Sequence, residues 1–450
     1  MKSLFRTFAP LATIVCTMLQ ASAALGQNAA APQSILFHNV RVFDGTSDRL
    51  SGAMNVLIEG NLITKISPAA LTPVKGAMVI NGAGRTLMPG LIDNHVHLFM
   101  SASSEAEMMD PKATFEGLEA KAAEEARLML LRGFTSARDV GGPVFGLKRA
   151  IDQGKNVGPR IYPSGAMISQ TSGHGDFRMP KDRSRRFGGS VTPGELMGIG
   201  FIADGRDEVL TATRENLRAG ATQIKVMAGG GAASAYDPLD VAQYTLDELK
   251  AAVEAADDWG TYVTVHAYTP KAVRRAVEAG VRCIEHGQLL DEPTMQLLGK
   301  KKIWLSLQAL DEAPPTASPA TIAKKHTVVE GTDNAFTWAK KYHVPLAWGT
   351  DLMFVPAQMT KQNTDIGKLT AWMSPAEALK LVTHDNAQLL ALSGLRNPYP
   401  GKLGVVEAGA LADLILVDGD PLANLSLIDE PAKNFAVIMK DGVIYKNSLR

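Results

Sequence analysis

The middle of the chain alternates between two hydrophobic periods, and this alternation constrains the fold more than any other feature. Stretches rich in Ala, Glu and Leu carry apolar residues at helical spacing, and a short apolar run typical of a strand follows each of them. Such pairs occur at 115–132 and 134–139, 208–219 and 222–227, 246–259 and 262–266, 270–279 and 282–286, 292–301 and 303–307, and 334–342 and 344–351. Helices alternating with strands predict an α/β protein with a parallel sheet, and this many units predict closure into a TIM-like (β/α)8 barrel.

A doubly wound open sheet is the alternative arrangement of the same units. No glycine-rich phosphate-binding loop opens a helix after the first strand, and this absence disfavours the open sheet. Beyond the last strand, Ser374, Pro375 and Glu377 supply an N-cap, a proline at the first helical position and a capping-box glutamate. They predict a helix that runs to about Leu392.

Both ends of the chain have a different character from its middle. Short alternating apolar runs separated by Gly and Asn occupy the stretch from Ile35 to about Leu87, and similar runs follow Gly404. We expect one small β-sandwich built from residues 27–88 and 399–450, around a barrel of residues 89–398. Two separate terminal domains are the alternative, but each would have few strands with which to close a core.

The first residues have the pattern of a secretory signal peptide. Lys2 and Arg6 precede an apolar run over 8–19, and small residues follow it. The run is shorter than the roughly 18 to 20 residues that a transmembrane span needs. We therefore expect a signal peptide over residues 1–26, export across the inner membrane to the periplasm or the medium, and no membrane attachment after cleavage. Only Cys283 would then remain, so no intramolecular disulfide is expected.

Charge excludes some classes of partner. Lysine plus arginine and aspartate plus glutamate both number 46 in the 450 residues, so the formal net charge is zero. A balanced chain has no single-sign field that would attract nucleic acid or an anionic membrane. We expect a small-molecule partner.

Residues able to bind a metal stand where the predicted strands end. The run Leu87–His97 ends in His95-Val96-His97, and side chains two apart on a strand point to the same face. Neutral imidazoles suit zinc and its neighbours. In a barrel the carboxyl ends of all strands converge on one face, where active sites are built. The other strand-end residues that would join the two histidines are Lys225, His266, His286 and Asp351.

Taken together, these motifs resemble the metal-site pattern of the amidohydrolase superfamily. Within it, the chain is most similar to the prolidase-like and imidazolonepropionase-like branch, which includes Xaa-Pro dipeptidases and ochratoxin-hydrolysing amidohydrolases. The motifs that carry the resemblance are His95-Val-His97, Ile-Lys225-Val-Met, Val-His266-Ala, Glu-His286-Gly and Gly-Thr-Asp351, together with Phe43-Asp-Gly near the start and Gly409-Ala-Leu-Ala-Asp near the end.

The resemblance implies a binuclear zinc centre and a homo-oligomer. His95, His97 and Asp351 would hold the more buried ion, His266 and His286 the more exposed one. A lysine ammonium cannot ligate a cation, so Lys225 would join the two ions as a carbamate made with CO2. Two Zn2+ per chain are expected, although Mn, Co or Fe would also suit these ligands. A bridging hydroxide would attack the substrate, with Asp351 first as general base and then as general acid.

Other residues are weaker candidates for the pocket. His174 lies in a glycine-rich loop and could bind substrate or serve only the loop. Tyr236 follows the triple glycine 229–231 and could donate to an oxyanion or a substrate carboxylate, or simply lie on the surface. Tyr268 stands where relatives often carry a second histidine. Arg138 and Asp139 are expected to pair beneath the site.

The function expected is hydrolysis of amide bonds in dipeptide-like or N-acyl amino acid substrates, with ochratoxin A-type amides that yield L-phenylalanine included. An Xaa-Pro dipeptidase proper is one alternative within the superfamily, and a hydrolase of cyclic amides or lactones is another. A non-catalytic binding module is the alternative outside it. Loss of Asp351 or Lys225 would have favoured the binding module, but both residues are present.

Overall fold

The computed structural model describes residues 34–108, 110, 112–234 and 236–449. The signal peptide predicted over residues 1–26 lies outside this part of the chain. Within the described residues, no helix has both the length and the apolar character needed to cross a membrane.

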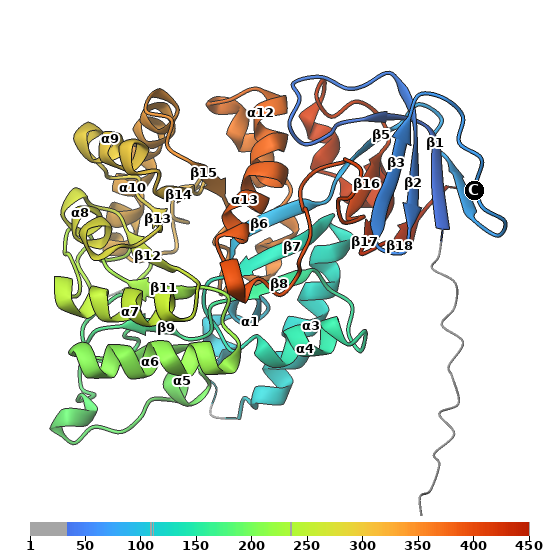
Figure 1. Ribbon diagram of the computed structural model, residues 1–450. Coiled ribbons are helices and arrows are strands. Elements are labelled where there is room, and N and C mark those ends of the chain that lie inside the picture. The colour runs from blue at the N-terminus through green and yellow to red at the C-terminus, as the bar shows by residue number, and fades with distance from the viewer. Residues whose placement is uncertain (1–33, 109, 111, 235, 450) are drawn as a thin grey trace, which may run out of the picture.

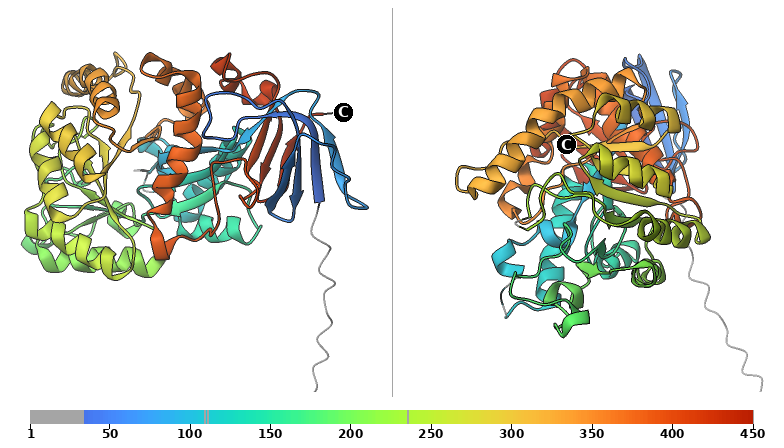
Figure 2. Two further views of the ribbon diagram at one scale, coloured as in Figure 1. Left: turned by 45° about the horizontal axis from the view of Figure 1, so that its top comes forward. Right: turned by 90° about the vertical axis from the view of Figure 1, so that its left-hand side faces the viewer.

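Strands from both ends of the chain form one sheet. They are β1 (Ser34–Val42), β2 (Ala53–Glu59), β3 (Leu62–Ser67), β4 (Met78–Asn81), β5 (Thr86–Pro89), β16 (Leu414–Val417), β17 (Phe435–Lys440) and β18 (Val443–Asn447). The order is β18-β17-β16-β5-β1-β2-β3, with β4 paired to β1. The blue and red strands lie side by side in both Figure 1 and Figure 2. The two ends therefore share one structure, whose strands pair as one continuous eight-stranded sheet.

The middle of the chain forms two parallel sheets. One has the order β6 (Leu91–Val96), β7 (Phe134–Asp139), β8 (Arg160–Pro163). The other has the order β10-β9-β11-β12-β13-β14-β15. Its strands are β9 (Met167–Ser169), β10 (Gly200–Ile202), β11 (Ile224–Met227), β12 (Val263–Ala267), β13 (Cys283–His286), β14 (Trp304–Leu307) and β15 (Leu346–Trp348). The alternation of helix and parallel strand is as predicted, but the backbone hydrogen bonds group the strands into two sheets rather than one.

Helices cover the outside of these sheets (Figure 1). They are α1 (Leu98–Ser101), α2 (Glu105–Met108), α3 (Phe115–Leu131), α4 (Phe145–Asp152), α5 (Pro193–Leu196), α6 (Arg206–Ala219), α7 (Leu246–Asp258), α8 (Pro270–Ala279), α9 (Glu292–Lys301), α10 (Pro319–Lys341), α11 (Thr364–Gly367), α12 (Pro375–Lys380), α13 (Asn386–Ala391) and α14 (Pro431–Asn434).

The helix expected at 334–342 is much longer than the sequence analysis allowed. It is α10, which begins at Pro319 with Ser318 as N-cap, whose side chain accepts a hydrogen bond from the Thr321 N–H. A serine followed by proline is the same start signal that correctly predicted α12 after Ser374. The first half of α10 was missed because its apolar spacing is weak, and this half proves to lie beside the site described below.

Hydrogen bonds connect β6 with β15 and the residues that follow β15. The Asn386 amide donates to the carbonyls of Ile92 (2.7 Å) and Trp348 (2.9 Å), and its oxygen accepts from the Trp348 N–H (2.9 Å). The Asp351 N–H donates to the His95 carbonyl at 2.9 Å. Asn386 follows a single π-helical turn, Leu381–Asp385, that joins α12 to α13. The end of the last strand is thereby fixed beside the end of the first.

Candidate metal centre

The histidines predicted as ligands lie together and are buried. His95 (1% exposed) is on β6, His97 directly follows β6, His266 is on β12, and His286 ends β13. Ring centroids are 5.3 Å apart for His95 and His97, 5.0 Å for His95 and His286, and 4.4 Å for His266 and His286. Strands far apart in sequence therefore place four imidazoles in one cluster, as the strand-end pattern predicted.

Asp351 completes one half of this cluster. It follows β15, and its Oδ1 lies 3.2 Å from His95 Nε2 and 3.4 Å from His97 Nε2. The three ligand atoms all lie within 4.8 Å of one another. Although Asp351 Oδ1 is buried, it forms no hydrogen bond with any described residue. A buried carboxylate oxygen without a hydrogen bond is costly unless a cation satisfies it.

One nitrogen of each imidazole is held by an oxygen of the protein. An oxygen acceptor fixes the N–H on that nitrogen and leaves a lone pair on the other. The pairs are His95 Nδ1 with Glu285 Oε2 (2.8 Å), His97 Nδ1 with the Gly141 carbonyl (3.1 Å), His266 Nε2 with the Gly230 carbonyl (3.1 Å) and His286 Nδ1 with Gln308 Oε1 (2.7 Å). This orientation is the one that metal-binding histidines need.

Lys225 lies on the strand next to that of His266. It is on β11, its side chain is 1% exposed, and it forms no hydrogen bond with the described residues. Burial lowers the pKa of Lys225, against the opposing effect of the Glu285 and Asp351 carboxylates. A buried lysine with a lowered pKa has more of the neutral amine, which is the form that reacts with CO2.

The electrostatics of the cluster favour the protonation states that a metal requires. Burial lowers the pKa of His97 and, more strongly, that of His266 and His286. Burial acts to raise the pKa of Asp351, but the neighbouring imidazoles hold it well below its ordinary value. His95 differs because two carboxylates, Asp351 and Glu285, raise its pKa against the effect of burial. A histidine that binds a metal must be neutral, and a carboxylate that binds one must be ionised. The pKa shifts of His97, His266, His286 and Asp351 favour these states.

Two of the candidate ligands have left-handed backbone conformations. His286 has φ 76° and Asp351 has φ 54°. Residues other than glycine adopt this region at a cost, which proteins tolerate mostly at functional sites. His286 is the last residue of β13 and Asp351 lies three residues after β15, so both positive φ angles fall where the chain leaves a strand.

His174 reaches the cluster from a loop. Its ring stacks on that of His266 with a centroid distance of 4.1 Å, and its Nδ1 lies 2.9 Å from Ser234 Oγ and 3.3 Å from Asp237 Oδ2. A Cβ at Gly231 would stand 1.8 Å from the His174 ring. Gly231, the last glycine of the triplet, is therefore required because the His174 ring approaches its Cα so closely. The sequence analysis named His174 as a candidate but did not connect it with this glycine.

Tyr236 and Tyr268 are placed differently. Tyr236 is 50% exposed, and within the described residues no hydrogen bond or ring contact joins it to the imidazoles. Tyr268 is 5% exposed, stacks on His286 at 5.1 Å and meets the edge of His266 at 5.1 Å. Tyr268 rather than Tyr236 is the tyrosine that borders the cluster.

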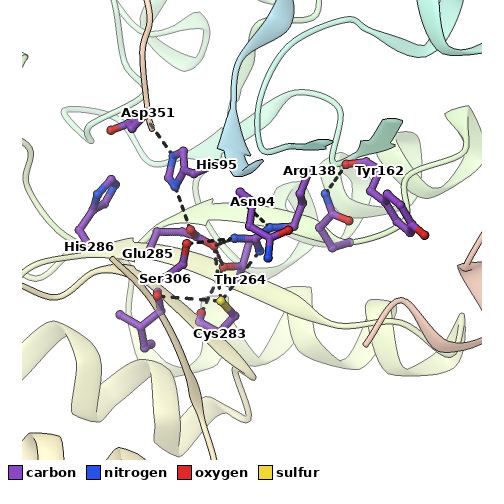
Figure 3. Close-up of polar contacts among 12 residues, drawn as sticks. Asn94, His95, Arg138, Tyr162, Thr264, Cys283, Glu285, His286, Ser306 and Asp351 are labelled. Atoms are coloured by element: carbon purple, nitrogen blue, oxygen red, sulfur yellow. Dashed lines mark hydrogen bonds and ion pairs between the residues drawn. The ribbon is translucent and has the colours of Figure 1, made fainter. Parts of the chain in front are cut away.

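Sequence reasoning missed Glu285, which lies beneath the cluster. Its Oε2 bonds His95 Nδ1, and its Oε1 lies 2.7 Å from Nη2 of Arg138, with both side chains fully buried (Figure 3). The expected pairing of Arg138 with Asp139 is wrong, because adjacent residues on a strand point to opposite faces. Asp139 instead accepts hydrogen bonds from the backbone N–H groups of Leu98 and Gly141.

Asp93 is a second residue that the motifs did not reveal. Its carboxylate accepts hydrogen bonds from the His95 N–H (3.0 Å), from the Thr350 N–H (3.1 Å) and hydroxyl (2.7 Å), and from the Gln362 amide (2.9 Å). It links the backbone next to His95 with the backbone next to Asp351. Asp93 is two residues before His95 and is therefore expected on the same face of β6 as the histidines, and this alternation was the available signal.

The residues present therefore fit a metal centre. Four oriented imidazoles, an ionised carboxylate with a hydrogen-bond-free oxygen, and a buried lysine form a set of donors that suits one or two divalent ions. The structure brings together the four histidines and Asp351, and it places Lys225 buried on the strand next to that of His266. A parallel α/β fold with a possible metal site of His95, His97 and Asp351 next to its strands is the arrangement of the amidohydrolase class.

The chain belongs to the amidohydrolase family. The profile of that family matches residues 86–446. Ochratoxinase from Aspergillus niger is 32% identical over 371 residues, covering 80% of this chain and 75% of that protein. A solved prolidase in complex with N-methylphosphonate-L-proline is 31% identical, with a TM-score of 0.84 over 92% of this chain and 100% of that one. A solved Xaa-Pro dipeptidase with bound methionine is 30% identical, with a TM-score of 0.79 over the same shares. These relatives are hydrolases, and they support a hydrolytic enzyme.

Proposed function

We propose that this protein is a binuclear metal-dependent amidohydrolase that releases an amino acid from a dipeptide or an N-acyl amino acid, ochratoxin A-type amides included. The observation that carries the proposal is the convergence of His95, His97 and Asp351 to within 4.8 Å, with the Oδ1 of Asp351 lacking a hydrogen bond. Relatives of this chain include an ochratoxinase, a prolidase solved with N-methylphosphonate-L-proline and an Xaa-Pro dipeptidase solved with methionine, and each of the two bound molecules is an amino acid or contains one.

In this proposal the ligands divide into two groups within one (β/α)8 barrel. His95, His97 and Asp351 would hold one ion and His266 and His286 the other, with Lys225 as a carbamate between them. Zinc suits these donors best, and Mn, Co or Fe could replace it. When bound, the metal pair supplies a nucleophile at neutral pH and an electrophile for the scissile carbonyl.

Asp351 is proposed to move the proton. Its carboxylate, whose pKa is held well below the ordinary value, accepts a proton from the attacking water. The same proton then passes to the leaving nitrogen as the C–N bond breaks, which gives a carboxylic acid and a free amino acid. His174, stacked on His266, and Tyr268, stacked on His286, border the space in which the substrate would lie.

The test combines metal analysis with a substrate panel. We expect about two zinc ions per purified chain and cleavage of Xaa-Pro dipeptides or N-acyl-L-phenylalanines, ochratoxin A included. Asp351→Asn should keep most of the metal and lose about 100- to 10,000-fold in kcat, the usual contribution of general acid–base catalysis. Lys225→Ala should lose both metal and activity. Turnover of cyclic amides or lactones alone, or an active Lys225→Ala variant with two ions, would refute the proposal.

Export and self-association complete the proposal. The amino-terminal pattern of residues 1–26 supports secretion, and mass spectrometry of the protein from the producing cells would identify the first residue of the mature chain. The homo-oligomer rests on the resemblance, and light scattering of the purified protein tests it.

A further inference from the structure

One face of α10 lies beside the metal centre. Val328 packs in a buried apolar cluster with Tyr268, the residue that stacks on His286. Gly331, three residues later, approaches the Gln288 carbonyl so closely that a Cβ would stand 2.2 Å from that oxygen. Residues three and four apart on a helix share a face, so Lys324 and Lys325 continue this face toward the start of the helix.

The two lysines have different surroundings. Lys324 Nζ donates to three carbonyls of the loop that also carries Asp237, namely those of Gly231 (3.1 Å), Ser234 (2.9 Å) and Asp237 (2.6 Å). Lys325 is partly buried, and it forms neither a hydrogen bond nor an ion pair with any residue that the structure describes. Lys324 therefore fixes the loop, whereas the Lys325 ammonium has no hydrogen-bond or ion-pair partner among the described residues.

The carboxylates that act on Lys325 have partners elsewhere. Asp351, Asp311 and Glu312 act to raise the pKa of Lys325, although burial lowers it more. Asp311 pairs with Lys368 at 2.7 Å, Glu312 pairs with His326 at 2.9 Å, and Asp351 faces the imidazoles. A partly buried ammonium without a counter-ion is unfavourable, and a ligand that brings a carboxylate would offset this cost.

We infer that Lys325 binds the α-carboxylate of the amino acid that the enzyme releases. This inference rests on the proposed function, because an N-acyl amino acid carries its carboxylate on the carbon next to the scissile nitrogen. Lys325 lies one helical turn before Val328, which packs with Tyr268 beside His286, so α10 places Lys325 on the side of the helix that faces the catalytic groups. Lys325 is thus a specificity residue, and it selects substrates with a free carboxylate over their amides and over cyclic amides.

The test compares an acid with its amide. N-acetyl-L-phenylalanine and N-acetyl-L-phenylalaninamide share the scissile bond but differ in the group that Lys325 would bind. Lys325→Met should lower kcat/KM for the acid about 10- to 100-fold, mainly through KM, and change the amide by less than about threefold. Lys325→Arg should restore part of the preference. Binding of L-phenylalanine, measured by calorimetry, should weaken in parallel.

Lys324→Met is the matched control on the same helix. Since Lys324 holds a loop, its loss should affect acid and amide equally and leave their ratio unchanged. An equal effect of Lys325→Met on both substrates, or no effect on the acid, would overturn the inference while leaving the proposed function standing. If the wild-type enzyme cleaves no acyl amino acid at all, the proposed function itself fails.

Discussion

At the residue scale, the cluster of histidines with Asp351 could be predicted, while the residues behind it could not. His95, His266 and His286 are on strands of the α/β part and Asp351 follows one, so their residue types and their places near strand ends indicated the cluster. The role of Glu285 could not be predicted, because a single glutamate inside an apolar strand belongs to no recognisable motif. Its partners, His95 and Arg138, are distant in sequence and are known only from the fold. The sequence analysis named Tyr236 as a candidate donor and Tyr268 only as a departure from the pattern of relatives, and packing reverses their order.

Glu285 gives a prediction at this scale. Glu285→Gln removes the charge that orients His95 Nδ1, so metal affinity should fall by about 10- to 100-fold, the usual effect of losing such a partner. The variant should also lose about 3 kcal/mol of stability, because the Arg138 guanidinium stays buried without its counter-ion. Competition with a chelator measures the affinity, and urea unfolding measures the stability.

Thr264→Val is the control for that variant. Thr264 donates its hydroxyl to the same carboxylate but carries no charge. We expect this substitution to keep metal affinity within about threefold of the wild type. A Glu285→Gln variant with normal affinity would mean that His95 is held by its strand rather than by the carboxylate.

At the element scale, helix and strand periods predicted the central units well. The strand at 134–139 and the helices at 270–279 and 292–301 have the bounds expected. What the periods could not predict is how neighbouring strands join, because that depends on side chains distant in sequence. Asn386, placed by a π-helical turn, satisfies backbone groups of both β6 and β15. No local pattern indicates that role.

The contact between β6 and the residues after β15 gives a prediction for Gly349. A Cβ there would stand 2.3 Å from the His95 nitrogen and 2.5 Å from its Cβ. Gly349→Ala should therefore displace β6 from the segment after β15, at a cost of about 1–3 kcal/mol in unfolding free energy, and reduce metal content. Differential scanning calorimetry and metal analysis check both effects.

Gly194→Ala is the matched substitution, since its added Cβ would approach only the Thr192 hydroxyl, at 3.9 Å. It should leave stability and metal content unchanged. If both alanine variants behave alike, the close approach at Gly349 is not what fixes Asp351 beside His95.

At the scale of the whole molecule, ion pairs join the terminal sheet to the α/β part. Arg160 on β8 pairs with Asp413 next to β16 at 2.9 Å and with Asp441 between β17 and β18 at 2.7 Å. Lys440 adds a hydrogen bond to the Gly158 carbonyl at 2.6 Å. The shared character of the two ends predicted that they would join in one β-sandwich, whereas these contacts depend on single charged residues whose partners lie far away in sequence.

Asp441 gives a prediction of pH dependence. Burial acts to raise its pKa, but the Arg160 guanidinium holds the pKa below the ordinary value of 3.8. A lowered pKa in the folded state adds stability above pH 4, and this stability is lost as the pH falls below that value. Asp441→Asn should cost at most about 1 kcal/mol at pH 7, because the pair is half-exposed, and the difference should shrink below pH 4.

Urea unfolding of both proteins at pH 7 and pH 3.5 measures this difference. Asp418→Asn removes the partner of Arg85 in a more exposed pair and should change stability little at either pH. A difference between Asp441→Asn and the wild type that is as large at pH 3.5 as at pH 7 would contradict the ionic origin.

The place of β16 in the terminal sheet has a consequence for how the chain is made. β16 pairs with β5 on one side and β17 on the other, so the amino-terminal strands keep an unpaired edge at β5 until β16 has been synthesised. Pairing across the whole α/β part of the chain makes this step slow. During that interval the β5 edge can pair with another chain, and a protein that lost β16 to β18 would keep this aggregation hazard permanently.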